Sequence, residues 1–282
     1  LIEKWVNVKC PKCRGKAKRE TDTMPNWAGS SWYYLRYIDP KNKKTFADKA
    51  KMKTWLPVDW YNGGMEHVTL HLLYSRFWHK FLYDQGFVPT KEPYKKRTAH
   101  GFVLASDGQK MSKSRGNVIN PDSVVKLLGA DTLRVYEMFM GPFTEAISWN
   151  TDSVAGSRRF IERVWRASLK VSKDKKEKND DLERLVNQTI KKVSEDYEEM
   201  KFNTSVSAMM IMLNEFEKAV SIPRACFETY LILLAPMAPH VTEELWMMLG
   251  NKKSIHLSSW PKYKLEHNKN YKVKIIVQVN SK

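Results

Sequence analysis

The sequence predicts an α/β domain followed by an all-α helical bundle. Residues 20–105 alternate short apolar strands with helical segments, the order typical of α/β folds. From about Asp152 the pattern becomes wholly helical, with wide apolar stripes that are expected to pack as a bundle. The length of 282 residues fits about two domains, and the hydrophobic content of 42% is enough for packed cores.

Residues 1–19 are basic and contain Cys10 and Cys13, spaced as in one half of a zinc knuckle. A tetrahedral zinc site needs four ligands, and the remaining cysteine, Cys226, lies far along the chain in an apolar segment. We therefore expect a remnant half-site, or a zinc site that another polypeptide completes.

A helix is predicted from about Glu66 to Tyr83, after Gly63-Gly64. One stripe on it is apolar and is expected to pack on a sheet, and a second stripe is expected to line a pocket. The upstream run from Lys41 to Lys53 has six lysines and one aspartate, which favours a solvated surface insertion over a tRNA-backbone contact. The apolar stripe comprises Leu70, Leu73, Phe77 and Phe81, and the second comprises His67, His71, Tyr74 and Trp78.

Further along, residues 102–105 predict a short buried strand. Asn120 is a good N-cap for a helix that Gly129 ends, and a second helix covers 131–140. The charged segment 173–181 is expected to be exposed, and residues 271–279 predict one strand that needs pairing partners. The bundle stripes comprise Phe160, Ile161, Val164, Trp165 and Leu169; Leu182, Leu185, Val186, Thr189, Ile190, Val193, Tyr197 and Met200; and Val206, Met209, Met210, Leu213, Phe216 and Val220.

The charge of the chain indicates a polyanionic partner. Lys and Arg number 48 against 31 Asp and Glu, a formal charge of +17. A lysine-rich, solvated or heat-adapted surface is the alternative, but ten tryptophans and twelve tyrosines favour nucleic acid. With three cysteines, no signal peptide and no long apolar run, we expect a soluble cytoplasmic protein with no membrane partner.

Gly63 to His67 have the chemistry of a nucleotide contact. Two glycines let the backbone approach a ligand closely, and the Glu66 carboxylate can accept hydrogen bonds from ribose hydroxyls. An equally good interpretation is a tight turn in which Glu66 interacts with the helix dipole. His67 and His71 lack a third ligand, so pocket-lining or core histidines are favoured over a metal pair.

The segment Lys110-Met111-Ser112-Lys113-Ser114 suits a mobile loop that grips phosphates, since it follows a predicted strand. A reaction at a nucleotide phosphate builds negative charge on the phosphate oxygens. Ammonium groups that meet this charge mainly in the transition state raise the rate.

The chain resembles the bacterial leucyl-tRNA synthetases, a family of class I aminoacyl-tRNA synthetases. The pentapeptide at 110–114 matches the signature loop of the class. Colinear matches from residue 20 to about 250 are more specific; they comprise residues 20–34, 61–67, 71–78, 106–121, 129–134, 140–143 and 234–246.

This resemblance implies the second half of a Rossmann-type catalytic domain (20–105), the loop with a stem-contact region (106–151) and an anticodon-binding helix bundle (152–250). These follow a remnant insertion (1–19) and precede a linker with the start of a truncated C-terminal domain (251–282). It implies ATP with Mg²⁺, leucine and tRNA(Leu) as ligands. Lys110 and Lys113 would be catalytic; Gly63, Gly64, Glu66, His67, Val103, Leu104 and residues Lys110, Met111, Ser112, Lys113 and Ser114 would bind ATP; His71 with Tyr33 or Tyr34 would wall the leucine pocket.

One departure from the family pattern is large. The early His-x-Gly-His motif of the class does not occur among the seven histidines, and the editing insertion has no counterpart. The resemblance therefore implies the C-terminal part, or β subunit, of a split enzyme, in a heterodimer whose α subunit carries both. A non-catalytic tRNA-binding module and a synthetase for another aliphatic amino acid are the alternatives.

Overall fold

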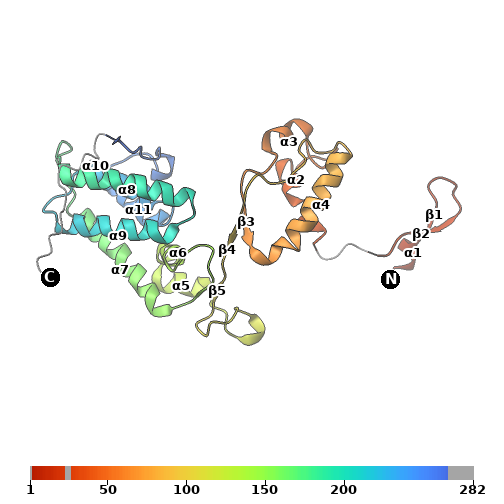
Figure 1. Ribbon diagram of the computed structural model, residues 1–282, viewed down its shortest axis with the longest axis horizontal. Helices are drawn as coiled ribbons and strands as arrows, with labels where there is room; N and C mark the ends of the chain where they lie inside the picture. The colour runs from red at the N-terminus through yellow and green to blue at the C-terminus, as the bar shows by residue number, and fades with distance from the viewer. Residues whose placement is uncertain (1, 23–26, 266–282) are drawn as a thin grey trace, which may run out of the picture. The chain divides into compact units, whose positions relative to one another are not determined.

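The computed structural model describes residues 2–22 and 27–265 and divides into two compact units, Leu1–His100 and Gly101–Lys282. Figure 1 shows the order of helices and strands along the chain. The strand predicted over 271–279 and residues 23–26 of the matching segment 20–34 lie outside the described residues. Each unit is described by itself.

The first unit begins with a small hairpin. Helix α1 (Glu3–Val6) leads into strands β1 (Asn7–Lys9) and β2 (Lys16–Lys18), which pair antiparallel with Val8 opposite Ala17. The tight turn between them contains both cysteines and places Arg14 at φ 61°.

The rest of this unit surrounds one parallel strand pair. Strand β3 (Tyr61–Gly64) pairs with β4 (Arg97–His100), with Gly64 opposite His100, and helix α4 (His71–Asp84) connects them. This β-α-β crossover is the unit expected of an α/β fold. The remaining elements are η1 (Gly29–Ser31), α2 (Tyr33–Ile38), α3 (Lys49–Trp55) and the 3-10 helix η2 (Met65–Val68).

The structure corrects the prediction for α4 in two ways. The helix begins at His71 rather than near Glu66, because η2 occupies the preceding turn. The stripe expected to pack on a sheet is instead largely exposed: Leu73 is 57%, Phe77 71% and Phe81 48% accessible. The buried residues of α4 are polar, namely His71, Ser75 and His79.

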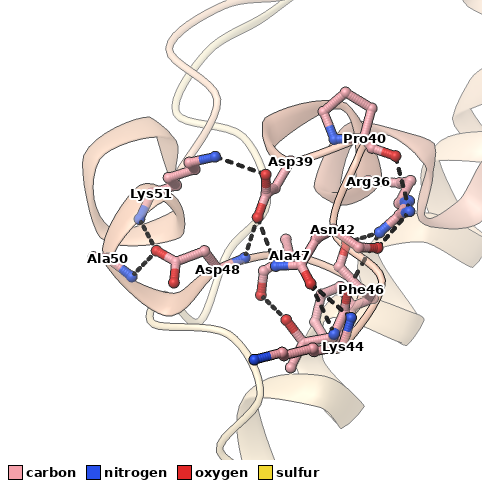
Figure 2. Close-up of polar contacts among 11 residues, drawn as sticks. Arg36, Asp39, Pro40, Asn42, Lys44, Phe46, Ala47, Asp48, Ala50 and Lys51 are labelled. Carbon is pink, nitrogen blue, oxygen red and sulfur yellow. Dashed lines mark hydrogen bonds and ion pairs between the residues drawn. The ribbon is translucent and has the colours of Figure 1, made fainter.

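The lysine-rich run is also more ordered than a solvated insertion. Arg36 donates hydrogen bonds to three carbonyl oxygens of this segment and to that of Pro40 just before it, and Asp39 accepts from the Lys51 ammonium at 2.6 Å (Figure 2). Asp48 caps α3 by accepting from the backbone N–H groups of residues 50 and 51. Ala47 and Met52 are consequently buried among apolar residues, whereas the lysine side chains of the run are exposed.

The second unit opens with a two-residue parallel pair, β5 (Val103–Leu104) with β6 (Ile147–Ser148). The predicted strand is therefore present, but it is not fully buried, since Val103 is 41% exposed. Helix α5 (Pro121–Leu128) begins at the predicted cap, where Asn120 accepts from the Asp122 N–H, and Gly129 ends it at φ 90°. Helix α6 (Ala130–Phe139) follows, and the 3-10 helix η3 (Lys113–Arg115) lies in the lysine loop.

Five helices form the predicted bundle. Figure 1 shows α8 and α9 side by side, and they are in contact. Most of the predicted stripes are buried in one large apolar cluster. Trp165, Leu169 and Val220 are exceptions, at 39%, 75% and 98% exposed, because they lie near or beyond helix ends or on the outer face. The helices are α7 (Thr151–Ser168), α8 (Asp180–Glu198), α9 (Phe202–Lys218), α10 (Arg224–Leu234) and α11 (Pro239–Met248), followed by η4 (Ile255–Leu257).

Within residues 2–22 and 27–265, the helices are all too short or too polar to cross a membrane.

Candidate active site

In the turn after β3, the Glu66 carboxylate lies against Gly64 and has no ion-pair partner among residues 2–22 and 27–265. A Cβ built on Gly64 would overlap the Glu66 carboxyl group, whose Cδ would lie 2.8 Å away. Any larger residue at 64 would therefore displace this carboxylate. Across the strand pair, Arg97 donates to the Gly64 carbonyl oxygen at 3.3 Å, which holds the turn in place.

A ring cluster surrounds His71 in the first unit. The His71 imidazole lies 5.9 Å from the Tyr33 ring and 5.7 Å from the Tyr61 ring, centroid to centroid. The two tyrosine hydroxyls are 3.3 Å apart. Next to them, the rings of His67 and Trp27 meet edge to face at 5.3 Å.

The His71 imidazole is buried without a hydrogen-bond partner for either nitrogen in the described part of the chain. Burial, and then the nearby His67, lower the pKa of His71, so the ring is held neutral. A buried polar group without a partner costs free energy, and such groups are typical of ligand sites. The cluster can therefore offer an apolar aromatic wall with one neutral imidazole.

Tyr34 lies behind this cluster rather than in it. Its hydroxyl bonds to His79 Nδ1 at 2.9 Å, and His79 Nε2 lies 2.8 Å from the Thr90 carbonyl oxygen. A carbonyl can only accept, so Nε2 carries the proton and the Tyr34 hydroxyl donates to Nδ1. Of the two tyrosines predicted for the pocket, Tyr33 contacts His71 and Tyr34 anchors α2 to α4.

Sequence reasoning did not identify Tyr61, Trp27 or His79 as part of this region. For His79 a signal exists: His71, Ser75 and His79 recur every four residues and share one helix face. Trp27 and Tyr61 contact the histidines only through tertiary packing, so spacing offers no signal for them.

The lysine loop lies in the second unit and has a rigid frame. Leu104 and Lys110 form an antiparallel bridge, closed by a turn with Gly108 at φ 74°. The Asn117 side chain accepts from the Ser112 N–H at 2.8 Å and donates to the Lys110 carbonyl at 3.4 Å. Met111 packs against the small apolar cluster of Leu133, Tyr136, Trp149 and Val154.

This frame leaves the lysine side chains at the surface. Lys113 is exposed and makes no ion pair among the described residues, and the Lys110 ammonium lies 4.6 Å from the centre of the Phe102 ring. The hydroxyls of Ser112 and Ser114 are 2.7 Å apart. The loop therefore presents ammonium and hydroxyl groups with no carboxylate to neutralise them, as a phosphate site requires.

The two parts of the predicted ATP site belong to different units. Gly63, Gly64, Glu66 and His67 lie in the first, whereas Val103, Leu104 and the lysine loop lie in the second. The residues of each part therefore lie together within a single unit.

Cys10 and Cys13 provide two sulfur donors but not a metal site. Backbone N–H groups of Cys13 and then Lys12 lower the pKa of the Cys10 thiol, which favours a thiolate ligand. Among residues 2–22 and 27–265, however, no group of three or more potential ligands could hold a metal ion. Cys226 is buried in α10 of the other unit, where burial raises its thiol pKa to about 12. The described residues therefore do not complete a tetrahedral set.

Comparison with known families agrees with this geometry. Residues 2–150 match the family of tRNA synthetases class I (I, L, M and V), and residues 179–282 match the anticodon-binding domain of tRNA ligase. The chain belongs to the class I tRNA synthetases. The predicted fold class is confirmed: a Rossmann-like catalytic half is joined to an anticodon-binding helical domain.

Individual relatives point to one branch of this family. The chain is 53% identical over 281 residues to the leucine–tRNA ligase of Alkaliphilus oremlandii (strain OhILAs), covering 100% of this chain and 35% of that protein. It matches Agrobacterium radiobacter K84 agnB2 LeuRS, solved with tRNA and LeuAMS, with a TM-score of 0.86 and 34% identity over 95% of this chain and 37% of that one. Mycobacterium tuberculosis methionyl-tRNA synthetase with methionyl-adenylate shares the fold, with a TM-score of 0.64 and 17% identity over 84% and 55%. The chain spans about a third of the length of the leucine–tRNA ligase it matches.

Proposed function

We propose that this chain is part of a leucine–tRNA ligase. The reaction activates leucine with ATP to leucyl-adenylate and pyrophosphate, then transfers leucine to the 3′ end of tRNA(Leu). The main observation that supports this proposal is the lysine loop, which the Asn117 side chain holds in place. Its Lys113 has no carboxylate partner in the described residues. The 53% identity to a leucine–tRNA ligase supports leucine as the amino acid.

Each predicted residue has a role in this proposal. Lys113, with Lys110, stabilises charge on the phosphates and on the leaving pyrophosphate, and Mg²⁺ accompanies the nucleotide. Glu66 accepts hydrogen bonds from the ribose hydroxyls, since its carboxylate lies beside Gly64 and forms no ion pair within the described part of the chain. The remaining roles are those of Gly63, Gly64 and His67 on the adenosine side, Val103 and Leu104 beside the adenine, and Met111, Ser112 and Ser114 in the loop.

The aromatic cluster is proposed to form the leucine pocket. Tyr33 and His71 supply its wall, and Tyr61 extends it. A neutral His71 suits an aliphatic side chain, because a charged imidazolium would be costly to bury beside it.

The proposal also includes a partner. The 282 residues contain no His-x-Gly-His motif, so a companion α subunit carrying this motif and the editing domain is proposed to complete the site in a heterodimer. Leucine-dependent pyrophosphate exchange, measured for the chain alone and with the companion, tests this idea. Activity should require both, and activity of the chain alone would eliminate the split arrangement.

Substitution of Lys113 tests the loop. In the complemented enzyme, Lys113→Met should slow exchange about 100- to 1000-fold, the usual effect of losing one transition-state interaction. The affinity for tRNA should change much less.

Lys126→Met, which removes an exposed lysine on α5, is the matched control and should leave the exchange rate near wild type. If Lys113→Met weakened tRNA binding without slowing exchange, its catalytic role would be excluded.

A further inference from the structure

The second unit contains a polar cavity whose lining does not include residues 110–114 of the lysine loop. It has a volume of about 810 Å³ and lies among α6, β6, α7 and α9. Its apolar wall includes Phe139, Met140 and Met210, and its polar side is formed by α7. These helices pack against one another, so the cavity has a rigid frame.

The α7 side of the cavity is a basic stripe. Arg159, Arg163 and Arg166 recur at spacings of four and three, so their side chains lie on one face of the helix. The first and last are separated by seven residues, or about 10 Å along the helix axis. Three guanidinium groups therefore line one side of a single cavity.

The charges in this cavity do not balance. Arg163 is neutralised by Glu217, to which it donates at 2.9 Å through Nε, and Glu162 is occupied by Arg158 at 2.8 Å. The guanidinium groups of Arg159 and Arg166 make no hydrogen bond or ion pair with other described residues. Two positive charges are left facing the cavity, which favours an anionic occupant.

A buried hydroxyl adds a second, independent observation. Ser157 lines the cavity, is 1% exposed, and its Oγ has no hydrogen-bond partner in the described structure. Burying a hydroxyl donor without a partner is unfavourable, and a ligand acceptor would remove that cost. Nearby, Gly156 leaves the cavity open, since a Cβ there would approach only Arg159, at 3.8 Å.

We propose that this cavity binds the phosphodiester backbone of an RNA. Arg159 and Arg166 each pair with a phosphate, Ser157 donates its hydroxyl to a phosphate oxygen, and the apolar wall packs against the ribose. The site deepens the proposed function and rests on it, since tRNA is the RNA which that function requires. Guanidinium groups suit phosphate because their N–H groups match its oxygens in pairs.

The test measures binding of the full chain to a tRNA(Leu) transcript as a function of salt concentration. Arg159→Gln and Arg166→Gln should each weaken binding about tenfold, the lower end for hydrogen bonds to charged groups. Each should also reduce the slope of log affinity against log salt by about 0.7–0.9, the value for one phosphate contact. Arg184→Gln, on α8 and outside the cavity, removes the same charge and should have a smaller effect.

A cavity-filling variant separates this site from a merely basic surface. Gly156→Leu keeps the charge and, in a helix interior, should not lower the thermal midpoint. It should nevertheless weaken tRNA binding, because the larger side chain would occupy space that the RNA backbone would enter. Gly156→Ala, which adds only a methyl group, should bind like wild type.

Free anions are distinguished with inorganic pyrophosphate as the competing probe. If the same variants weakened the binding of pyrophosphate but left the binding of tRNA unchanged, the assignment of the cavity to RNA would be overturned. Equal effects of Arg184→Gln and Arg166→Gln, or no effect of Gly156→Leu, would overturn the cavity as the site. Leucine-dependent pyrophosphate exchange needs no tRNA, so it is measured separately, for the wild type and the variants together with the companion subunit. Loss of exchange in all of these proteins, the wild type included, would count against the proposed function alone.

Discussion

The interior of the helix bundle and the interior behind α4 are built on opposite principles. In the bundle, apolar side chains from α7 to α11 form one large cluster, and Phe216 is 0% exposed at its centre. Behind α4, the buried face is His71, Ser75 and His79, while Phe77 on the outer face is 71% exposed. The same kind of amphipathic helix is thus inverted in the first unit.

Hydrogen bonds account for the inversion. His79 joins the Tyr34 hydroxyl to the Thr90 carbonyl, and Ser75 accepts from the Tyr94 hydroxyl at 2.8 Å. These pairs offset the cost of burying polar groups. The bundle interior also contains hydrogen-bonded polar groups such as Asp196 and Thr242, but most of its buried side chains are apolar, so burial of apolar surface is its main source of stability. The difference teaches that the bundle interior mainly provides stability, whereas the α4 interior places polar side chains beside the proposed leucine pocket.

The largest expected effect is in the bundle. Phe216→Ala removes a ring that lies 5.4 Å from Tyr230 and 5.9 Å from Phe227, centroid to centroid. It should lower the free energy of unfolding by about 3–5 kcal/mol, measured by urea denaturation. Ile211→Ala on the same helix, 58% exposed, is the control and should cost far less. Equal losses would mean that the cluster is not the source of bundle stability.

The second prediction concerns pH. Burial lowers the pKa of both His71 and His79, so the folded first unit binds fewer protons than the unfolded chain. Its stability should therefore be full above the unfolded histidine pKa of about 6.5 and fall as the pH drops below it. Glu92, whose pKa is held at about 2 by Arg76 and Lys80, does not titrate in this range.

Hydrogen exchange at pH 7.5 and 5.5, corrected for intrinsic rates, separates the two regions. Peptides from α4 should lose protection at the lower pH, and peptides from α9 and α10 should not. Equal loss in both regions would assign the pH dependence to the whole chain rather than to the buried histidines.

The smallest effect is expected on the outer face of α4. Phe77→Ser should change the free energy of unfolding by less than about 0.5 kcal/mol, because the ring is exposed. Ser75→Ala, two residues away, should cost more, about 1–3 kcal/mol, since it removes the acceptor of the Tyr94 hydroxyl. The reverse order, measured by urea denaturation, would contradict the inverted burial of this helix.

Much of the second unit followed from the sequence. The cap at Asn120, the end at Gly129 and the bundle helices depend on local chemistry and periodicity, and the structure has them as predicted. The loop at 110–114 could also be found from the sequence, because its two lysines and two serines are close together in one short segment. Its frame was not, since Asn117 reaches back to Ser112 and Lys110 only in the folded turn.

The sequence by itself determined where most of the helices form and which residues are proposed to bind phosphate, because both depend on neighbours in the chain. Only the tertiary structure decided which face of α4 is buried, that Tyr33 rather than Tyr34 contacts His71, and that the lysine run folds around Arg36 and Asp39. Periodicity shows that a helix has two faces. Which face is buried depends on the hydrogen-bond partners available across the fold, and these come from distant parts of the chain.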